Sequence, residues 1–173
     1  MPSFVGHSVF GLAIDRLLPR GGKRGFLSAL VLSNAADLDY FPKLLSEKSG
    51  LPPVRTSHSL AWALGIGTMN GIVSSQTRRR FLPSFVRGAA LYSSHLLLDL
   101  LSKESPGGIP LFWPLTTRRY ALPWTFFVTI RSRRRSGFLK GLLNRNNAYA
   151  VKRELAITLP TLSMAVLIRR LID

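Results

Sequence analysis

Apolar residues recur along the chain in five separate stretches. Glycine- and proline-rich segments separate these stretches, as at Gly50–Pro53 and Ser105–Gly108. The stretches cover about residues 4–18, 26–46, 59–75, 84–101 and 154–172. This pattern predicts five main helices with little or no sheet, and therefore an all-α, multi-helix bundle. The length of 173 residues predicts one domain, covering residues 1–173.

Two of the stretches are candidates for membrane spans. Residues 59–75 would form about 26 Å of helix, against a bilayer hydrocarbon core of about 30 Å. The last stretch is interrupted by Pro160 and ends at Arg169 and Arg170, whose side chains could reach a membrane interface. A buried core helix is the alternative for this stretch. We expect a membrane-associated bundle, with several transmembrane helices or a tight association with the bilayer.

The start of the chain resembles a helix of the mature protein more than a removable signal. No basic residue precedes its apolar stretch, and no obvious small-residue cleavage site follows it. We therefore expect residues 4–18 to form the first helix of the fold.

The charge of the chain restricts its partners. Lys and Arg total 24 against 8 Asp and Glu, a net charge of +16, so anionic partners are expected. Nucleic acid and anionic lipid are the two natural candidates. The hydrophobic fraction of 46% and the positive mean hydropathy favour membrane lipid over nucleic acid. The basic residues cluster in connections that suit contact with headgroups, at Arg20–Arg24, Arg78–Arg80, Arg118–Arg119 and Arg131–Arg135.

The composition also restricts the chemistry. The chain has no cysteine, which excludes a disulfide framework, a cysteine-type zinc site and a thiol nucleophile. A Gly-x-Ser-x-Gly elbow and a P-loop are both absent from the sequence. Any bound metal must therefore be held by His, Asp or Glu.

All three histidines lie in or beside apolar stretches, where a polar side chain needs a partner. His95 and Asp99 are four residues apart, so on a helix they share one face and could chelate an ion. A buried hydrogen bond between them is the alternative. His58 lies between Ser57 and Ser59 and could equally be the neighbour of a helix cap. His7 precedes Gly11 by one turn, which leaves room for a close approach on its face.

Two acidic residues interrupt the second apolar stretch. Asp37 and Asp39 would lie on different sides of a regular helix, and Pro42 follows them, so the helix is expected to end here. One aspartate would face inward as a ligand, while the other caps a helix or binds a second ion. A helix cap at Asp39 is the simpler alternative.

Together these positions predict a single metal site. Neutral imidazole and carboxylate ligands suit a divalent ion, most of all zinc, with manganese or another divalent ion as the alternative. Such an ion would favour hydrolysis, with Asp39 and Asp99 as catalytic carboxylates and Asp39 accepting the proton. Arg55 is a candidate to bind an anionic substrate such as a phosphoester. The expected ligands are His7, Asp37, Asp39, His58, His95 and Asp99.

Four motifs occur in the order found in a known family. GHSVFG, ADLDYFP, TSHSL and SHLLLDLLSKESPGGIPLFWPL resemble the successive motifs of the YdjM-like inner-membrane proteins. The resemblance covers residues 4–115 and implies a metal-dependent hydrolase in the bacterial inner membrane. It also implies that the six residues above are metal ligands or neighbours of ligands. More distantly, the pattern is similar to zinc-dependent phospholipases C and P1-type nucleases, which cleave phosphate esters.

Two other functions are compatible with the same residues. The first is a non-catalytic, basic membrane protein that binds nucleic acid or an acidic partner, with the histidines serving structure. The second is a membrane scaffold or transport component, in which buried His and Asp side chains relay protons or hold helices together.

Overall fold

The computed structural model describes residues 2–18, 24–39, 56–77, 80–102, 107–124, 126–127 and 145–173. For Arg24, Asp39, Arg145 and Asn146 it describes the backbone alone. Helices account for most of these residues, in the order α1 (Phe4–Leu17), α2 (Arg24–Asn34), η1 (Ala35–Asp39), α4 (Leu60–Ser75), α5 (Phe81–Leu100) and α7 (Arg145–Ile172). Within these ranges the only strand-like contacts are two isolated bridges. The all-α prediction is confirmed.

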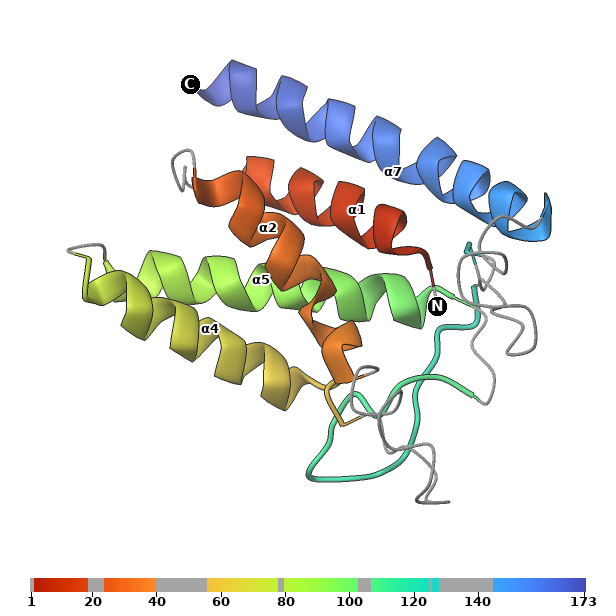
Figure 1. Ribbon diagram of the computed structural model, residues 1–173, viewed down its shortest axis with the longest axis horizontal. Helices are drawn as coiled ribbons and strands as arrows, with labels where there is room; N and C mark the ends of the chain where they lie inside the picture. The colour runs from red at the N-terminus through yellow and green to blue at the C-terminus, as the bar shows by residue number, and fades with distance from the viewer. Residues whose placement is uncertain are drawn as a thin grey trace.

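The helices form a layered bundle in which α5 is central (Figure 1). α4 packs along one side of α5, with which it forms a hairpin, and α1 and α2 pack along the other. α7 lies on the outer side of α1. The start of α1, the end of α5 and the start of α4 come together at one end of the bundle, beside η1 (Figure 1).

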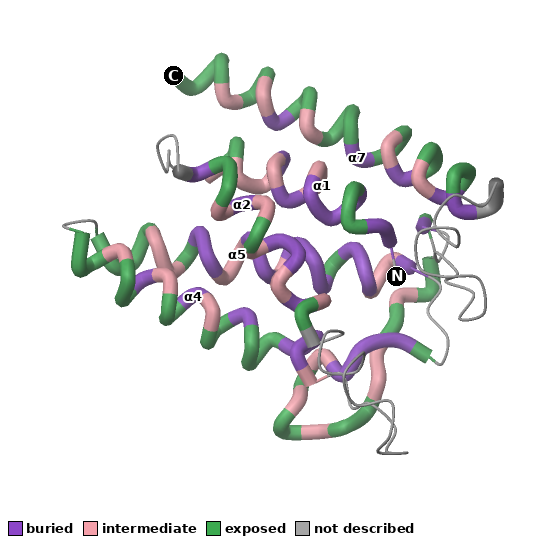
Figure 2. Tube along the Cα trace, in the orientation of Figure 1, coloured by how far each residue is buried: buried purple, intermediate pink, exposed green. Residues whose placement is uncertain are grey.

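The helix contacts of the α4–α5 hairpin use small residues. Ala63, Gly67 and Gly71 are the buried residues of α4, one turn apart. A Cβ atom on Gly67 would lie 2.9 Å from the Cβ of Ala89 on α5, so only glycine allows this approach. The large apolar residues of α4 point outward instead, and Figure 2 shows this helix mostly exposed. Small residues inside and large apolar residues outside are typical of helices packed in a bilayer.

One described helix is long and apolar enough to cross a membrane. It is the Asn147–Ile172 part of α7, and only 11% of its apolar window is buried in the bundle. α7 is continuous through Pro160, so the interruption expected there does not occur. α4 has 16 residues, which is shorter than a full span requires. Several transmembrane helices are therefore not confirmed by helix length.

A buried carboxylate links α7 to the start of α1. Glu154 accepts hydrogen bonds from the backbone N–H of Ser3, at 2.9 and 3.0 Å, and from the Ser3 hydroxyl. Ser3 is also the N-cap of α1, because its hydroxyl accepts from the Gly6 N–H at 3.0 Å. A Cβ on Gly6 would lie 2.8 Å from the carboxylate, so glycine makes room for Glu154.

At the opposite end of the bundle, Arg87 joins three helices. From α5 its Nε donates to Asp15 of α1 at 2.8 Å. Its remaining nitrogens donate to the Ser28 hydroxyl at 2.8 Å and to the Gly25 carbonyl at 2.7 Å, both on α2. This buried ion pair is completed by hydrogen bonds on every side of the guanidinium.

Candidate metal centre

Four elements bring five of the predicted ligands to one point. α1 carries His7 in its first turns, and η1 carries Asp37. His58 precedes the N-cap of α4, Ser59, by one residue. α5 carries His95 and Asp99 one turn apart on its buried face. Residues separated by more than 90 positions in the sequence thus meet at the end of the bundle beside η1.

Asp99 is the centre of the cluster. Its two carboxylate oxygens lie 3.6 Å from His7 Nε2, 3.2 Å from His58 Nε2 and 3.5 Å from His95 Nε2. Asp37 Oδ1 lies 3.7 Å from both His58 Nε2 and His95 Nε2. The His7 and His95 rings stack with their centroids 3.7 Å apart. The three imidazoles and two carboxylates therefore converge on one small volume.

Several of these atoms are buried without a hydrogen bond. Among the described residues they include both ring nitrogens of His7, Nε2 of His95 and both oxygens of Asp99. His7, His95 and Asp99 are at most 1% exposed. Leaving such groups unsatisfied costs roughly 1–3 kcal/mol each. A second component that binds these atoms would remove this cost.

The spacing of the atoms fits ligands of a metal ion. Ligands at 2.0–2.1 Å from a tetrahedral ion are separated by about 3.3–3.4 Å, whereas a hydrogen bond to an imidazole is usually below about 3.2 Å. The observed distances of 3.2–3.7 Å suit the first description better. Two ligand triads can be formed, His7–His95–Asp99 and Asp37–His58–His95, each with its ligand atoms within 4.8 Å of one another.

Hydrogen bonds orient two of the imidazoles. The Ser33 carbonyl lies 2.8 Å from His95 Nδ1, so this nitrogen carries the proton and Nε2 presents its lone pair to the cluster. Nδ1 of His58 lies 2.9 Å from the Ser57 hydroxyl. Tyr92 in turn donates to the Ser57 carbonyl at 2.7 Å, which holds this turn against α5. His95 is a member of both triads, so the two triads form one connected site. Its single free nitrogen, Nε2, can bind one ion at a time.

The site is accessible from the side of η1. The side chain of Asp37 is 36% exposed, whereas those of His7, His58, His95 and Asp99 are closed to solvent. Burial raises the pKa of Asp37, but the nearby His58, His95 and His7 rings lower it by more. The pKa of Asp37 therefore lies below the ordinary value. Asp37 is therefore a charged carboxylate at the mouth of the site.

Not every predicted residue can be placed. The backbone of Asp39 ends η1, but its side chain lies outside the described ones. Arg55 lies outside the described residues, as do most residues of the basic clusters other than Arg118 and Arg119. The Ser33 carbonyl and the Tyr92 hydroxyl were not predicted from the sequence. The first is a backbone group, and the second reaches the site through the Ser57 backbone carbonyl. The sequence indicated Ser57 only as a residue near a possible helix cap, whereas its hydroxyl lies 2.9 Å from His58 Nδ1.

The order of the motifs and the cluster they form agree with a comparison to known families. The chain matches the family described as YdjM inner membrane protein over residues 1–172. The chain belongs to the YdjM family. This membership confirms the resemblance of the sequence motifs and assigns the protein to an inner membrane family. No curated protein and no solved structure matches the chain, so the more distant likeness to phospholipases C and P1-type nucleases stays a prediction.

Proposed function

We propose that this YdjM family member is a membrane-bound hydrolase that uses a divalent ion, preferably zinc, to cleave a phosphoester. The observation that carries the proposal is the set of buried, unsatisfied atoms of His7, His95 and Asp99 around one point. Histidine and aspartate without cysteine suit zinc, with manganese or another divalent ion as the next choice. When bound, such an ion lowers the pKa of a water molecule and polarises a phosphoryl oxygen.

The residues of the chain divide the remaining work. Asp99 lies among the three imidazoles and supplies the negative charge at the centre of the site. Asp37 is the described site carboxylate that solvent reaches, so it is placed to accept a proton from an attacking water. Asp39 follows on the same short helix and remains the other candidate for this role.

The choice of a phosphoester rests on charge. A chain with a net charge of +16 attracts anions in general, which favours an anionic substrate. Arg55, three residues before His58, is the basic residue closest in sequence to a ligand. We keep it as the candidate that binds the phosphoryl group, because guanidinium groups recognise phosphate by paired hydrogen bonds.

We also propose that the protein passes the membrane more than once. α7 is long enough to span a bilayer. The α4–α5 hairpin packs through small residues, as helices within membranes do. Trp62, Leu64, Met69, Ile72 and Val73 of α4 are all between 44% and 59% exposed. An apolar face of this size is unfavourable in water and favourable against lipid chains.

Hydrolysis is tested with a soluble substrate. Detergent-purified protein loaded with zinc or manganese is assayed on bis(p-nitrophenyl) phosphate, beside Asp99→Asn and a control, Ser94→Ala. Among the described residues the Ser94 hydroxyl donates to the Leu91 carbonyl of its own helix, so the control changes a buried α5 residue outside the cluster. Turnover in the wild type and the control, lost in Asp99→Asn, is expected. Equal turnover in all three proteins would refute the assignment.

A further inference from the structure

The approach to the metal site is defined by what surrounds Asp37. Four of the five described ligands are closed to solvent, so a substrate must pass beside η1. Leu38, the next residue of η1, is 57% exposed and apolar. A single exposed leucine is common on protein surfaces, so its meaning depends on whether other apolar residues lie near it. The surroundings of the mouth therefore indicate the kind of surface that it meets.

The segment from Gly107 to Trp124 lies beside this mouth (Figure 1). Its residues Ile109 and Leu111 pack into one apolar cluster with Ala36 of η1 and Ala63 of α4. The Leu111 carbonyl also accepts from the Leu60 N–H at 2.9 Å, two residues after His58. The segment is therefore attached to the two elements that carry Asp37 and His58.

A turn with two glycines fixes the segment in this place. Gly107 and Gly108 have φ angles of 90° and 107°, a region that other residues rarely adopt. A Cβ on Gly108 would lie 2.1 Å from the Tyr120 carbonyl oxygen. Ile109 and Tyr120 then exchange backbone hydrogen bonds of 2.9 and 2.8 Å. Within the closed loop between them, Pro110 is buried and Trp113 is half-buried, whereas Phe112 and Leu115 are exposed.

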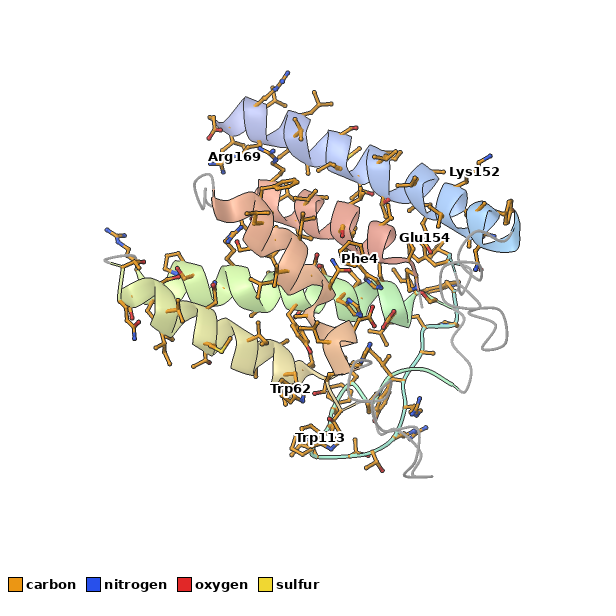
Figure 3. All side chains as sticks on the ribbon, in the orientation of Figure 1. Phe4, Trp62, Trp113, Lys152, Glu154 and Arg169 are labelled. Carbon is orange, nitrogen blue, oxygen red and sulfur yellow. The ribbon has the colours of Figure 1, made fainter. Side chains whose placement is uncertain are left out.

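Several side chains on this loop and beside it are large, apolar and exposed. All three tryptophans of the chain lie here or directly beside it: Trp62 at the start of α4, and Trp113 and Trp124 on the segment. Figure 3 shows Trp62 and Trp113 close together at the end of the bundle where η1 lies. Leu115 is 90% exposed and Trp124 is 68% exposed. We define the aromatic rim as the exposed residues Trp62, Phe112, Leu115, Trp124 and Phe126 together with the half-buried Trp113.

Two arginines accompany the rim. Arg118 is exposed and its guanidinium lies 5.9 Å from the centre of the Tyr120 ring. Arg119 donates to the Gly108 carbonyl at 3.2 Å, which holds it at the base of the loop. Tryptophan mixed with arginine is typical of protein surfaces at the level of lipid headgroups. The arginines match the charge of the phosphate groups found there.

The position of the candidate membrane span, Asn147–Ile172 of α7, indicates where a bilayer would lie. α7 begins at the side of the bundle where α1 starts and α5 ends, and its other end is at the opposite side (Figure 1). Tyr149, near the first residue of the span, is 62% exposed. A bilayer crossed by α7 would therefore have one of its interfaces on the side of the bundle where α1 starts and α5 ends, which carries His7 and Asp99.

From these observations we infer that the aromatic rim lies in the membrane–water interface, against phospholipid headgroups, and that the metal site opens there. Asp37 then meets the phosphate level of one leaflet instead of bulk water. One consequence rests on the proposed function: the phosphoester would belong to a lipid of that leaflet, taken up past η1 without leaving the membrane.

The position of Trp124 tests this inference without any turnover. In a Trp62→Phe, Trp113→Phe protein, Trp124 is the only tryptophan, and the protein is placed in vesicles that contain phosphatidylglycerol. Some vesicles carry bromine on the acyl chains near the glycerol, others at the methyl end. Bromine near the glycerol should quench Trp124 at least about twice as strongly as bromine at the methyl end. Aqueous iodide should quench it weakly.

A matched control calibrates the depth. Leu159 is half-exposed and lies near the middle of the α7 span. In a protein without other tryptophans, Leu159→Trp should be quenched most by bromine at the methyl end. If the tryptophan variants fold poorly, Leu115→Cys provides a second measurement, because the chain has no other cysteine to label. An environment-sensitive dye at position 115 should then report an interface.

The outcomes separate this inference from the proposed hydrolase. Strong iodide quenching of Trp124 with no effect of brominated lipid would overturn the inference, whether or not the protein hydrolyses a soluble phosphodiester. Shallow bromine quenching would support it even in a protein with no turnover, and only the hydrolase proposal would then fail.

Discussion

Two buried polar clusters lie at opposite ends of the same helices, and they differ in how their charges are compensated. At one end Arg87 meets Asp15, Ser28 and Gly25 at hydrogen-bond distances, and each of its nitrogens has a partner. At the other end three imidazoles and two carboxylates stand 3.2–3.7 Å apart, with several atoms unsatisfied. The first cluster is complete within the chain, whereas in the second the buried atoms of His7 and Asp99 have no hydrogen-bond partner among the described residues. Burial of charge alone therefore does not distinguish a structural site from a binding site. The difference lies in whether the buried polar atoms have hydrogen-bond partners.

The largest effect is expected from breaking the complete cluster. Arg87→Met leaves Asp15 without its partner and should destabilise the protein by about 3 kcal/mol, the lower end for a buried ion pair, because the unpaired carboxylate is largely but not fully buried. Thermal unfolding in detergent measures this loss. Metal affinity at the other end should stay within about twofold of the wild type. A large loss of metal affinity in Arg87→Met would show that the two clusters are not independent.

The next effect concerns the incomplete cluster. His95 supplies the nitrogen that both ligand triads share, so His95→Ala should lower zinc affinity by about 100-fold or more. Competition with a chromophoric chelator measures the change, with Ser94→Ala as the control. Without metal, His95→Ala should cost less stability than Arg87→Met, because the lost hydrogen bond to the Ser33 carbonyl is partly offset by the removal of a buried, unsatisfied nitrogen. A metal-free His95→Ala protein as unstable as Arg87→Met would make the His/Asp cluster structural.

The smallest effect is expected from an orienting group. Ser57→Ala removes the hydroxyl that contacts His58 Nδ1 and should lower zinc affinity by about tenfold. Tyr92→Phe, which removes the hydrogen bond to the Ser57 carbonyl, should change affinity less because the Ser57 hydroxyl is retained. The same chelator competition compares the two. A lower zinc affinity in Tyr92→Phe than in Ser57→Ala would contradict the prediction that the Ser57 hydroxyl contributes more to orienting His58.

The sequence predicted the parts of the site that depend on local spacing. His95 and Asp99 are one turn apart, and a helix places them together wherever it packs. Asp37 and Pro42 indicated the end of a helix, and α2 does change into η1 before Asp37. The convergence of His7 and His58 on Asp99 came from the motif order and from their apolar context, not from spacing.

Other features had no signal in the sequence. The Ser33 carbonyl orients His95, but any residue carries a carbonyl. The start of α7 at Arg145 was missed because its first turns are polar, although the helix continues into the apolar stretch. The partner of Arg87 was not predicted either, since a basic residue in an apolar helix does not reveal which aspartate it meets. Such contacts depend on the three-dimensional arrangement of the helices.

The central claim is that the His/Asp cluster binds a metal ion. Elemental analysis of detergent-purified protein tests it most directly, with zinc, manganese, iron and nickel counted per chain. The wild type is compared with a His58→Ala, His95→Ala, Asp99→Ala triple variant and with Arg87→Met. Near-stoichiometric metal in the wild type and in Arg87→Met, lost in the triple variant, is the predicted result. Equal trace metal in all three proteins would contradict the account.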